Sequence, residues 1–384
     1  MTLQSELLDH CRERVTDAHA SELLPRFAKA VERYPVAPPL LYTMGMVCLQ
    51  FGYFDLWTLY TRMAFELPHV SHQDVLFRAE AKIRLDDWSG WVDREARCFN
   101  PRETAHWEPY ARQVQWATQR WNGEEDITHK TILVITDGGF GDLFQMLRYI
   151  PSLASVAGAV ILTVPLECRA YVQFAIGHRA TVISADDVPA MSFERYTWLM
   201  SLAAILGPLS PFQPFDAPHP LRRIGSIDAR PRIGICWAGV SNAPYNTRDP
   251  HRSLSLDDLA PVLSRTDVRC YSLQVGYWAS DAERYPILRQ PPVSLVTFVD
   301  TANVIAGLDC VVTVDTSVAH LAGILGVPTF LLLHLAGDFR WGTTGFTPWY
   351  PSMHIIRQRA RTDWAGVIRR LMAHLDTLPL RDCA

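Results

Sequence analysis

From residue 131 onward the sequence alternates between short apolar segments and helical segments, and this alternation constrains the fold most strongly. Continuous apolar runs are typical of strands buried on both faces of a parallel sheet. The expected strands are Thr131–Thr136, Ala159–Val164, Ala180–Ile183, Arg232–Trp237, Arg269–Gln274, Cys310–Val314 and Thr329–Leu333. The expected helices are Asp142–Leu153, Leu256–Ser264, Ala302–Gly307, Val318–Leu325 and about 362–375. Two successive α/β units predict two parallel-sheet domains facing a cleft, with ligands at the carboxyl ends of the strands.

The region before this alternation is helical in pattern and contains no clear strand. Within it, Leu41–Pro68 has the pattern of a tetratricopeptide-type helix pair, with Gly45 at a close approach of two helices and a turn at 51–53. One such repeat cannot bury its own face, so we expect the region to pack on itself or on the rest of the chain. A polar break at 122–126 and a proline-rich linker around 212–220 then separate three expected domains. Their expected bounds are 1–128, 129–222 and 223–384.

The composition excludes several classes of protein. Of the 384 residues, 48% are hydrophobic and 20% are charged, which is typical of a soluble globular chain. The net charge of −4 does not favour binding to nucleic acid. The sequence has neither a secretory leader nor an apolar run long enough to span a bilayer, so we expect no transmembrane segment. The eight cysteines are scattered without a Cys-x-x-Cys pair, as expected for reduced thiols in the cytoplasm.

The segment 312–322 carries the clearest candidate for a binding site. An apolar strand runs into Asp315, Thr316 and Ser317, and a helix that contains His320 follows directly. Thr and Ser favour the N-cap position, and the free N–H groups and dipole of a helix start attract anions. This pattern predicts a site for a phosphate or a diphosphate. The alternatives are that Asp315 is a turn carboxylate and that His320 is a core histidine.

A second candidate is the glycine-rich loop between the first expected strand and helix. Gly139 and Gly141 allow a tight turn and a close approach to a ligand, and Asp142 follows at the helix start. The spacing matches neither the dinucleotide fingerprint nor the P-loop. Asp142 is either a capping residue of the turn or a general base that takes a proton from an acceptor hydroxyl.

The third candidate is the polar loop that follows Trp237-Ala238-Gly239. It contains Arg248 and Arg252, separated by Pro250, and precedes a helix expected near residue 255. Arginines in such a loop can hold phosphate oxygens through bidentate contacts, whereas the alternative is a solvated loop. A fourth group, 338–341 with 349–351, combines aromatic residues and arginine, and either lines a nucleotide pocket or belongs to the core.

With these motifs the chain resembles the lipopolysaccharide heptosyltransferase family, in particular the branch in which a tetratricopeptide-like helical region precedes the transferase. The resemblance covers roughly 131–358. It is carried by Gly141-Asp142, by Arg252-Ser253-Leu254 after Ile235-Cys236-Trp237, by 309–321 and by Trp349-Tyr350-Pro351-Ser352-Met353. It implies a glycosyltransferase B fold, in which two Rossmann-like domains follow the helical region. The domain at 129–222 would lie on the acceptor side, and the domain at 223–384 would hold the nucleotide-sugar donor.

The resemblance also implies roles for single residues. Asp142 matches the family's proposed base, and Arg252 stands where the family places a basic residue on the donor phosphates. The donor motif matches at Asp315, Thr316, Ser317 and His320, with serine at a position where glycine is common. Donor-binding residues are thus expected at Gly139, Gly141, Trp237, Arg248, Arg252, Asp315, Thr316, Ser317 and His320.

The sequence therefore predicts a metal-independent transferase without a cofactor. It would move a sugar from a nucleoside-diphosphate sugar to a hydroxyl on a glycan, lipid or protein, with a heptose-like donor as one option. No Asp-x-Asp metal motif lies at an expected strand end. The expected location is the cytoplasm, either free or at the inner face of the membrane, with a protein partner for the helical region as an option. One alternative is a non-catalytic helical-repeat binding module with a degenerate transferase domain. Another is a nucleotide-sugar epimerase of similar fold.

Overall fold

The chain divides into two compact units. The computed structural model describes residues 37–69, 71–99, 120–209, 214–216, 218, 230–239 and 252–377, with Pro25, Phe27 and Lys29. The first unit comprises Met1–Ala105, His334–Thr343 and Arg357–Asp363. The second comprises His106–Leu333, Thr344–Ile356 and Trp364–Ala384. The first unit therefore includes two segments that come from far along the sequence.

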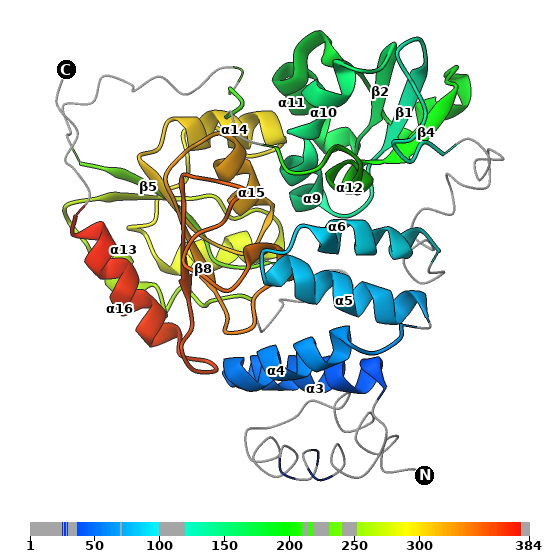
Figure 1. Ribbon diagram of the computed structural model, residues 1–384. Coiled ribbons are helices and arrows are strands. Elements are labelled where there is room, and N and C mark those ends of the chain that lie inside the picture. Colours follow the sequence, from blue (N-terminus) through cyan, green and yellow to red (C-terminus); the bar gives the residue numbers. More distant parts are fainter. Residues whose placement is uncertain are drawn as a thin grey trace. The chain divides into compact units, whose positions relative to one another are not determined.

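The first unit is helical, and Figure 1 labels its helices α3 (Pro38–Gln50), α4 (Phe54–Phe65), α5 (His72–Arg84) and α6 (Ser89–Asp93). The short 3-10 helices η1 (Arg94–Phe99) and η7 (Phe339–Trp341) also belong to it. Helices α3 and α4 pack against each other as the expected helix pair. Gly52 has a φ of 85° in the turn between them. A Cβ atom on Gly45 would lie 3.3 Å from Trp57 Cδ1, so the close approach expected at this glycine is present.

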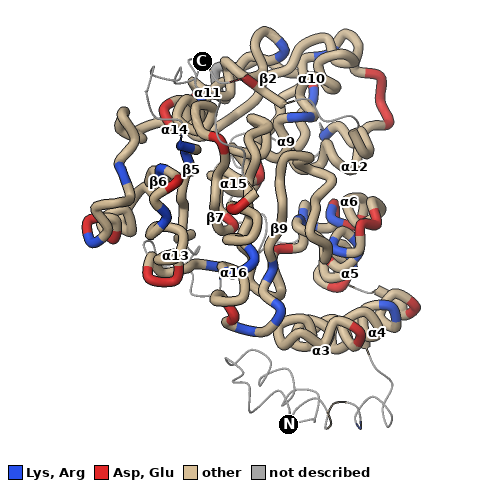
Figure 2. Tube along the Cα trace, turned by 90° about the vertical axis from the view of Figure 1, so that its left-hand side faces the viewer, with Lys and Arg blue, Asp and Glu red and all other residues tan. Residues whose placement is uncertain are grey.

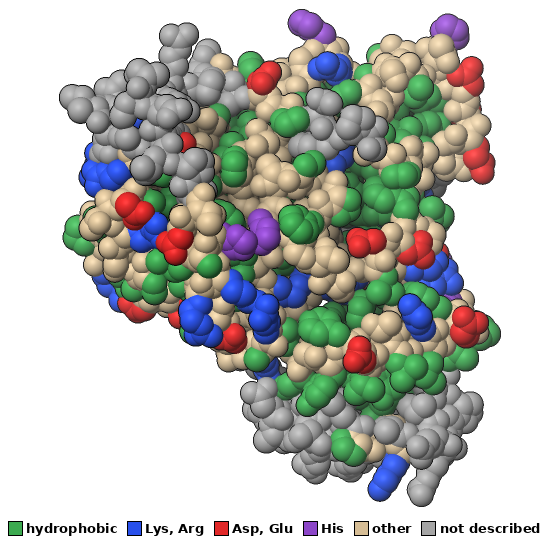
Figure 3. Space-filling view, turned by 60° about the vertical axis from the view of Figure 1, so that its left-hand side comes forward, with side chains coloured by type: hydrophobic (Ala, Val, Ile, Leu, Met, Phe, Trp, Pro, Cys, Tyr) green, Lys and Arg blue, Asp and Glu red, His purple; other side chains and the backbone are tan. Residues whose placement is uncertain are grey.

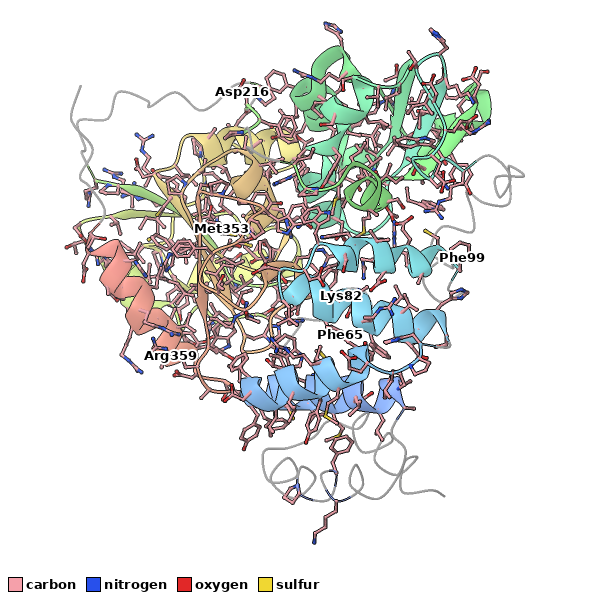
Figure 4. The ribbon with its side chains drawn as sticks, viewed as in Figure 1. Phe65, Lys82, Phe99, Asp216, Met353 and Arg359 are labelled. Carbon is pink, nitrogen blue, oxygen red and sulfur yellow. The ribbon has the colours of Figure 1, made fainter. Side chains whose placement is uncertain are left out.

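Helix α5 has well-defined ends. Ser71 and Asp74 form a capping box, in which each side chain accepts a hydrogen bond from the other residue's backbone N–H. Arg78 and Lys82 of α5 both pair with Asp93 of α6, at 2.7 and 2.8 Å, and Figure 4 labels Lys82. These contacts join the two helices through charged side chains that are mostly buried.

The second unit contains two separate sheets. The first has four strands in the order β3-β2-β1-β4, and its three pairings are all parallel. The strands are β1 (Thr131–Ile135), β2 (Ala159–Thr163), β3 (Thr181–Ile183) and β4 (Arg195–Trp198). Its helical segments are α9 (Phe140–Met146), α10 (Tyr149–Ala154), α11 (Leu166–Ile176), η3 (Gly177–Arg179), η4 (Ala185–Ala190), η5 (Leu199–Ser201) and α12 (Leu202–Leu206). The chain joins this sheet before residue 129, because the Trp121 N–H donates to Tyr196 O at 2.8 Å.

The second sheet has five strands in the order β6-β5-β7-β8-β9. The strands are β5 (Arg232–Cys236), β6 (Arg269–Ser272), β7 (Cys310–Val314), β8 (Thr329–Leu333) and β9 (Met353–Arg357). The helical segments are α13 (Ala260–Leu263), η6 (Tyr277–Arg284), α14 (Phe298–Ala306), α15 (Ser317–Ile324) and α16 (Trp364–Leu375). All residues of β7 are buried and none is charged, which matches its tan trace in Figure 2. Its continuous apolar sequence thus reflects a central position in a parallel sheet.

Two of the expected helices were predicted too long. The expected helix Asp142–Leu153 is interrupted, and α9 and α10 lie on either side of Leu147 and Arg148. Pro151 has no N–H to donate to the carbonyl of Leu147, so a continuous α-helix cannot form there. Within Leu256–Ser264, only α13 is helical, because Pro261 likewise cannot donate to Asp257.

Other elements were shifted or missed. Helix α14 begins four residues earlier than expected, since Thr297 and Asp300 form a capping box. Strands β4 and β9 and helix α11 were not predicted at all. Most of the proline-rich linker lies outside the described residues. Within its described part, the Phe215 N–H donates to Ile324 O of α15 at 2.7 Å.

Candidate functional site

The glycine-rich loop connects β1 to α9 and holds Asp142 in a capping role. Oδ2 of Asp142 accepts a hydrogen bond from the Gly139 N–H at 2.8 Å. Gly138 has a φ of 112°, and a Cβ atom there would lie 2.5 Å from the same oxygen. The turn therefore requires glycine at 138. Gly139 is the N-cap residue of α9, so Asp142 is not the N-cap but the third helical residue, which binds the Gly139 N–H; its role as a base stays a prediction.

The side chain of Asp137, which was not among the predicted site residues, fixes the loop between β1 and α9. Its side chain is fully buried, and its Oδ1 accepts a hydrogen bond from the Met200 N–H at 2.8 Å. The loop after β1 is thereby joined to the segment after β4. A polar residue directly after an apolar strand was the only signal in the sequence, and the partner strand β4 had not been predicted.

Gly141 lies against His320 where α9 packs on α15. A Cβ atom on Gly141 would lie 2.6 Å from Cδ2 and 3.1 Å from Nε2 of His320, so only glycine fits here. His320 is 5% exposed, and its Nδ1 lies 2.8 Å from the hydroxyl of Tyr350. Phe140 and Phe144 of α9 also contact Phe298 of α14, with ring centroids 5.0 and 4.9 Å apart. Two candidate residues, on helices that follow strands of different sheets, are therefore in direct contact.

The start of α15 has the features expected of an anion site. Thr316 is the N-cap residue, with extended backbone, but its side chain does not cap the helix. Its hydroxyl instead lies 3.2 Å from the hydroxyl of Thr313 and 3.8 Å from Sγ of Cys236. Asp315, Thr316 and Ser317 are only partly buried. Within the described part of the chain, the Thr316 side chain thus makes no capping hydrogen bond to the N–H groups of the first turn, at the carboxyl end of β7.

The loop after β5 lies beside this helix start. A Cβ atom on Gly239 would lie 2.9 Å from Nε of Arg252 and 3.4 Å from the carbonyl oxygen of Asp315. Gly239 is thus enclosed between Arg252 and Asp315, which places a guanidinium next to the start of α15. Arg248 lies outside the described residues, so its expected contact with phosphate stays a prediction.

Trp237 is fully buried at the carboxyl end of β5. Its indole Nε1 is buried and has no hydrogen-bond partner among the described residues. Cys236 beside it is also buried, and burial raises the pKa of its thiol to about 11. The sulfur therefore stays protonated at neutral pH.

The aromatic residues of the fourth candidate group are buried, as the core alternative predicts. Phe339, Trp341, Trp349 and Tyr350 are all buried. Residues 338–341 belong to the first unit and 349–351 to the second. The guanidinium of Arg148, directly before α10, lies 5.0 Å from the ring centroid of Trp349 and 5.3 Å from that of Tyr350, which joins the start of α10 to this segment.

Among the residues that the structure describes, no group of three or more His, Cys, Asp and Glu side chains is arranged to hold a metal ion. In the same part of the chain, no helix is both long enough and apolar enough to cross a bilayer. Basic and acidic side chains both occur on the face shown in Figure 3, with hydrophobic ones between them.

Comparisons with known proteins give distant similarities. No protein-family profile matches the chain. Over 319 residues it is 23% identical to Protein FlbA of Caulobacter vibrioides, an alignment that covers 74% of this chain and 52% of that protein. The chain thus spans about half the length of this curated relative.

Among solved structures, a glycosyl transferase of family 9 from Veillonella parvula aligns with a TM-score of 0.47 and 11% identity, covering 66% of this chain and 98% of that one. The E. coli heptosyltransferase WaaC with ADP-2-deoxy-2-fluoro heptose aligns with a TM-score of 0.43 and 14% identity, covering 64% and 100%. At these values the function has to be argued from the residues of this chain.

Proposed function

We propose that the protein is a glycosyltransferase that binds a nucleoside-diphosphate sugar at the start of α15 and transfers the sugar to an acceptor hydroxyl. The observation that carries the proposal is the juxtaposition of Arg252, Gly239 and the start of α15 at the carboxyl end of β7, where the Thr316 side chain does not cap the helix. A helix start and a guanidinium together suit a diphosphate. Both groups would also stabilise the negative charge that develops on the leaving diphosphate.

Two further features support transfer, rather than binding alone. The donor motif 315–320 and the Gly141-Asp142 pair are those of the resemblance to heptosyltransferases, and His320 and Gly141 are in contact. In the proposed reaction Asp142 takes the proton of the acceptor hydroxyl, whose oxygen then forms the new bond to the sugar. The bond between the sugar and the diphosphate breaks, and the nucleoside diphosphate leaves with its electron pair.

The arrangement of the two sheets also agrees with the glycosyltransferase B fold that we propose, with the donor on the second sheet. Under this proposal Ser317 contributes its backbone at the helix start, and Trp237 and Gly239 form the wall opposite it. The reaction is proposed to need no metal ion, because Arg252 and the helix start supply positive charge. Turnover that disappears in EDTA and returns with Mg²⁺ or Mn²⁺ would contradict this part of the proposal.

The experiment that tests the donor site is calorimetric titration of the full-length chain with ADP, GDP, UDP and dTDP. Arg252→Ala and Thr316→Ala should each weaken the binding of the preferred diphosphate by about 1–3 kcal/mol, if each removes a charge-assisted hydrogen bond to the diphosphate. Arg284→Ala, on the partly exposed segment η6, is the matched control and should leave the affinity unchanged. Unchanged affinity in both test variants would remove the site from the start of α15.

A further inference from the structure

We propose that Gln274 is a positioning residue of the donor site, which holds the backbone of Trp237–Gly239 in the conformation that the diphosphate requires. The inference rests on the proposed function, because it concerns the same site. Its basis is a set of hydrogen bonds at the carboxyl end of β6 that no motif in the sequence had indicated.

The side chain of Gln274 replaces backbone pairing where the sheet ends. Strands β5 and β6 pair in parallel up to Ile235 and Ser272, and the Leu273 N–H still donates to Ile235 O at 2.8 Å. Beyond this point Oε1 of Gln274 accepts hydrogen bonds from the N–H groups of Trp237 at 3.2 Å and Ala238 at 2.9 Å. Its Nε2 donates to Ala238 O at 3.1 Å. One amide thus binds both polar backbone groups of Ala238.

The remaining contacts of this amide explain why position 274 requires glutamine. Nε2 also donates to Val275 O at 3.4 Å, and the thiol of Cys236 donates to Oε1 at 3.5 Å. Gln274 is 8% exposed, so these bonds form away from bulk water, where an unpaired amide group is unfavourable. A glutamate would keep the acceptor but would bring an oxygen against the carbonyl of Ala238.

The next residue along the turn is fixed from the opposite side. The Gly239 N–H donates to Oγ of Ser253 at 3.1 Å, and the Leu254 N–H donates to Trp237 O at 2.8 Å. The segment Trp237–Gly239 is therefore held between Gln274 and the residues that directly follow Arg252. Because Gly239 lies against both Arg252 and Asp315, a shift of this segment would move the guanidinium and the helix start apart. Gln274 acts on the donor through this segment and does not itself need to contact it.

A matched control is present in the first sheet. The side chain of Gln173, which is exposed, also binds three backbone groups: Nε2 donates to Gly177 O at 2.8 Å and to Ala180 O at 3.4 Å, and Oε1 accepts from the Val182 N–H at 3.2 Å. These groups lie at the amino end of β3, away from the carboxyl ends where the proposed donor binds. Substituting Gln173 should therefore reduce stability without changing donor affinity.

The test compares Gln274→Met with Gln173→Met in the full-length chain, by thermal unfolding and by calorimetric titration with the four nucleoside diphosphates. Both variants should unfold at lower temperature, but only Gln274→Met should bind the preferred diphosphate about tenfold or more weakly, which corresponds to the loss of one or two net hydrogen bonds. Gln274→Glu should show the same selective loss. Affinity equal to that of the wild type in either folded Gln274 variant would overturn the proposal.

A second measurement needs no variant. If Gln274 holds the segment before the donor arrives, the amides of Trp237 and Ala238 should exchange slowly with solvent deuterium in the unliganded wild type. Fast exchange there would overturn the proposal even if the variants did not fold. If the wild type binds none of the four diphosphates, the proposed function fails, and the exchange of these amides still decides whether Gln274 fixes the segment.

Discussion

The carboxylate of Asp142 accepts a hydrogen bond from the Gly139 N–H, so the residue caps α9 as well as belonging to the proposed site. The two roles are compatible, because a carboxylate has two oxygens and one of them satisfies the turn. The hydrogen bond also fixes the direction of the side chain relative to Gly138, whose positive φ depends on the absence of a Cβ atom. A substitution at 142 must therefore keep the cap if it is to report on catalysis alone.

Asp142→Asn meets that requirement. The asparagine oxygen can accept the same hydrogen bond, so the thermal midpoint and the affinity for the preferred diphosphate should stay close to those of the wild type. Sugar transfer should fall by about 10²–10⁴-fold, because an amide cannot take the acceptor's proton. Steady-state transfer assays with the donor identified by calorimetry measure the effect. Normal transfer would reduce Asp142 to a capping residue.

Gly141→Ala tests the contact with His320. The added methyl would lie 2.6 Å from the imidazole, which is itself held by Tyr350, so we expect a loss of stability of about 1–3 kcal/mol from overpacking. Transfer should fall as well, because His320 is displaced. Gly139→Ala is the control: its Cβ atom would have no neighbour closer than 3.8 Å, and its φ is −88°. Equal urea midpoints for the two variants would show that the contact is not tight.

At the scale of elements, the strands were predictable because strands buried on both faces have continuous apolar sequences. The continuous apolar runs at β1, β2, β5, β7 and β8 gave their positions within one residue. Strand β4 was missed because its polar residues Arg195 and Thr197 alternate with aromatic residues, so its sequence is not a continuous apolar run. Helix ends depend on single residues. Pro151 cannot donate a hydrogen bond to the carbonyl of Leu147, and the predicted helix did not take this local effect into account.

The candidate site was predictable where its residues are consecutive, and less so where its contacts join distant elements. The order strand, Asp-Thr-Ser, helix gave the start of α15 correctly. The contact of Gly141 with His320 and the hydrogen bonds of Gln274 depend on the packing of elements far apart in sequence. Nothing in the spacing of these residues indicates such contacts, which is why Gln274 and Asp137 were not found.

The pairing of Asp93 with Arg78 and Lys82 predicts how the stability of the helical unit depends on pH. Burial raises the pKa of Asp93, but hydrogen bonds from Arg78 and Lys82 outweigh it and leave the pKa below its ordinary value. The stabilisation is therefore complete above the unfolded pKa of about 3.9 and is lost as pH falls through the lower, folded value. Asp93→Asn should cost about 1–3 kcal/mol at pH 7 and progressively less toward pH 3.

Urea unfolding of the wild type and of Asp93→Asn at pH 7, 5, 4 and 3 measures this difference. The two midpoints should converge as the pH falls, since protonation removes the charge in the wild type. Asp55→Asn, at an exposed position of α4, is the control and should change the midpoint little at any of these pH values. A constant difference between wild type and Asp93→Asn would show that the charge of Asp93 does not stabilise the unit.

At the scale of the whole molecule, the helical unit is not an independent segment of the chain. It includes His334–Thr343, the residues that directly follow β8 in sequence, and Ala336 is part of its apolar core. The N-terminal region alone would lack these residues. We therefore expect the N-terminal helices not to form this core without the segment that follows β8.

Arg84 tests whether the helical unit holds the segment 334–343. Its side chain is 4% exposed, and Nη1 donates to the carbonyls of Ala336, Gly337 and Asp338 at 2.6, 3.3 and 3.4 Å. Arg84→Ala leaves these carbonyls without their donor, and Arg84→Lys restores the charge but not the planar fork that spans them. Limited proteolysis of the full-length chain should therefore cut within 334–343 faster in both variants, with Arg84→Ala the more susceptible. Arg62→Ala, on the exposed side of α4, should be cut at the wild-type rate, and equal rates in all four proteins would mean that Arg84 does not hold this segment in the helical unit.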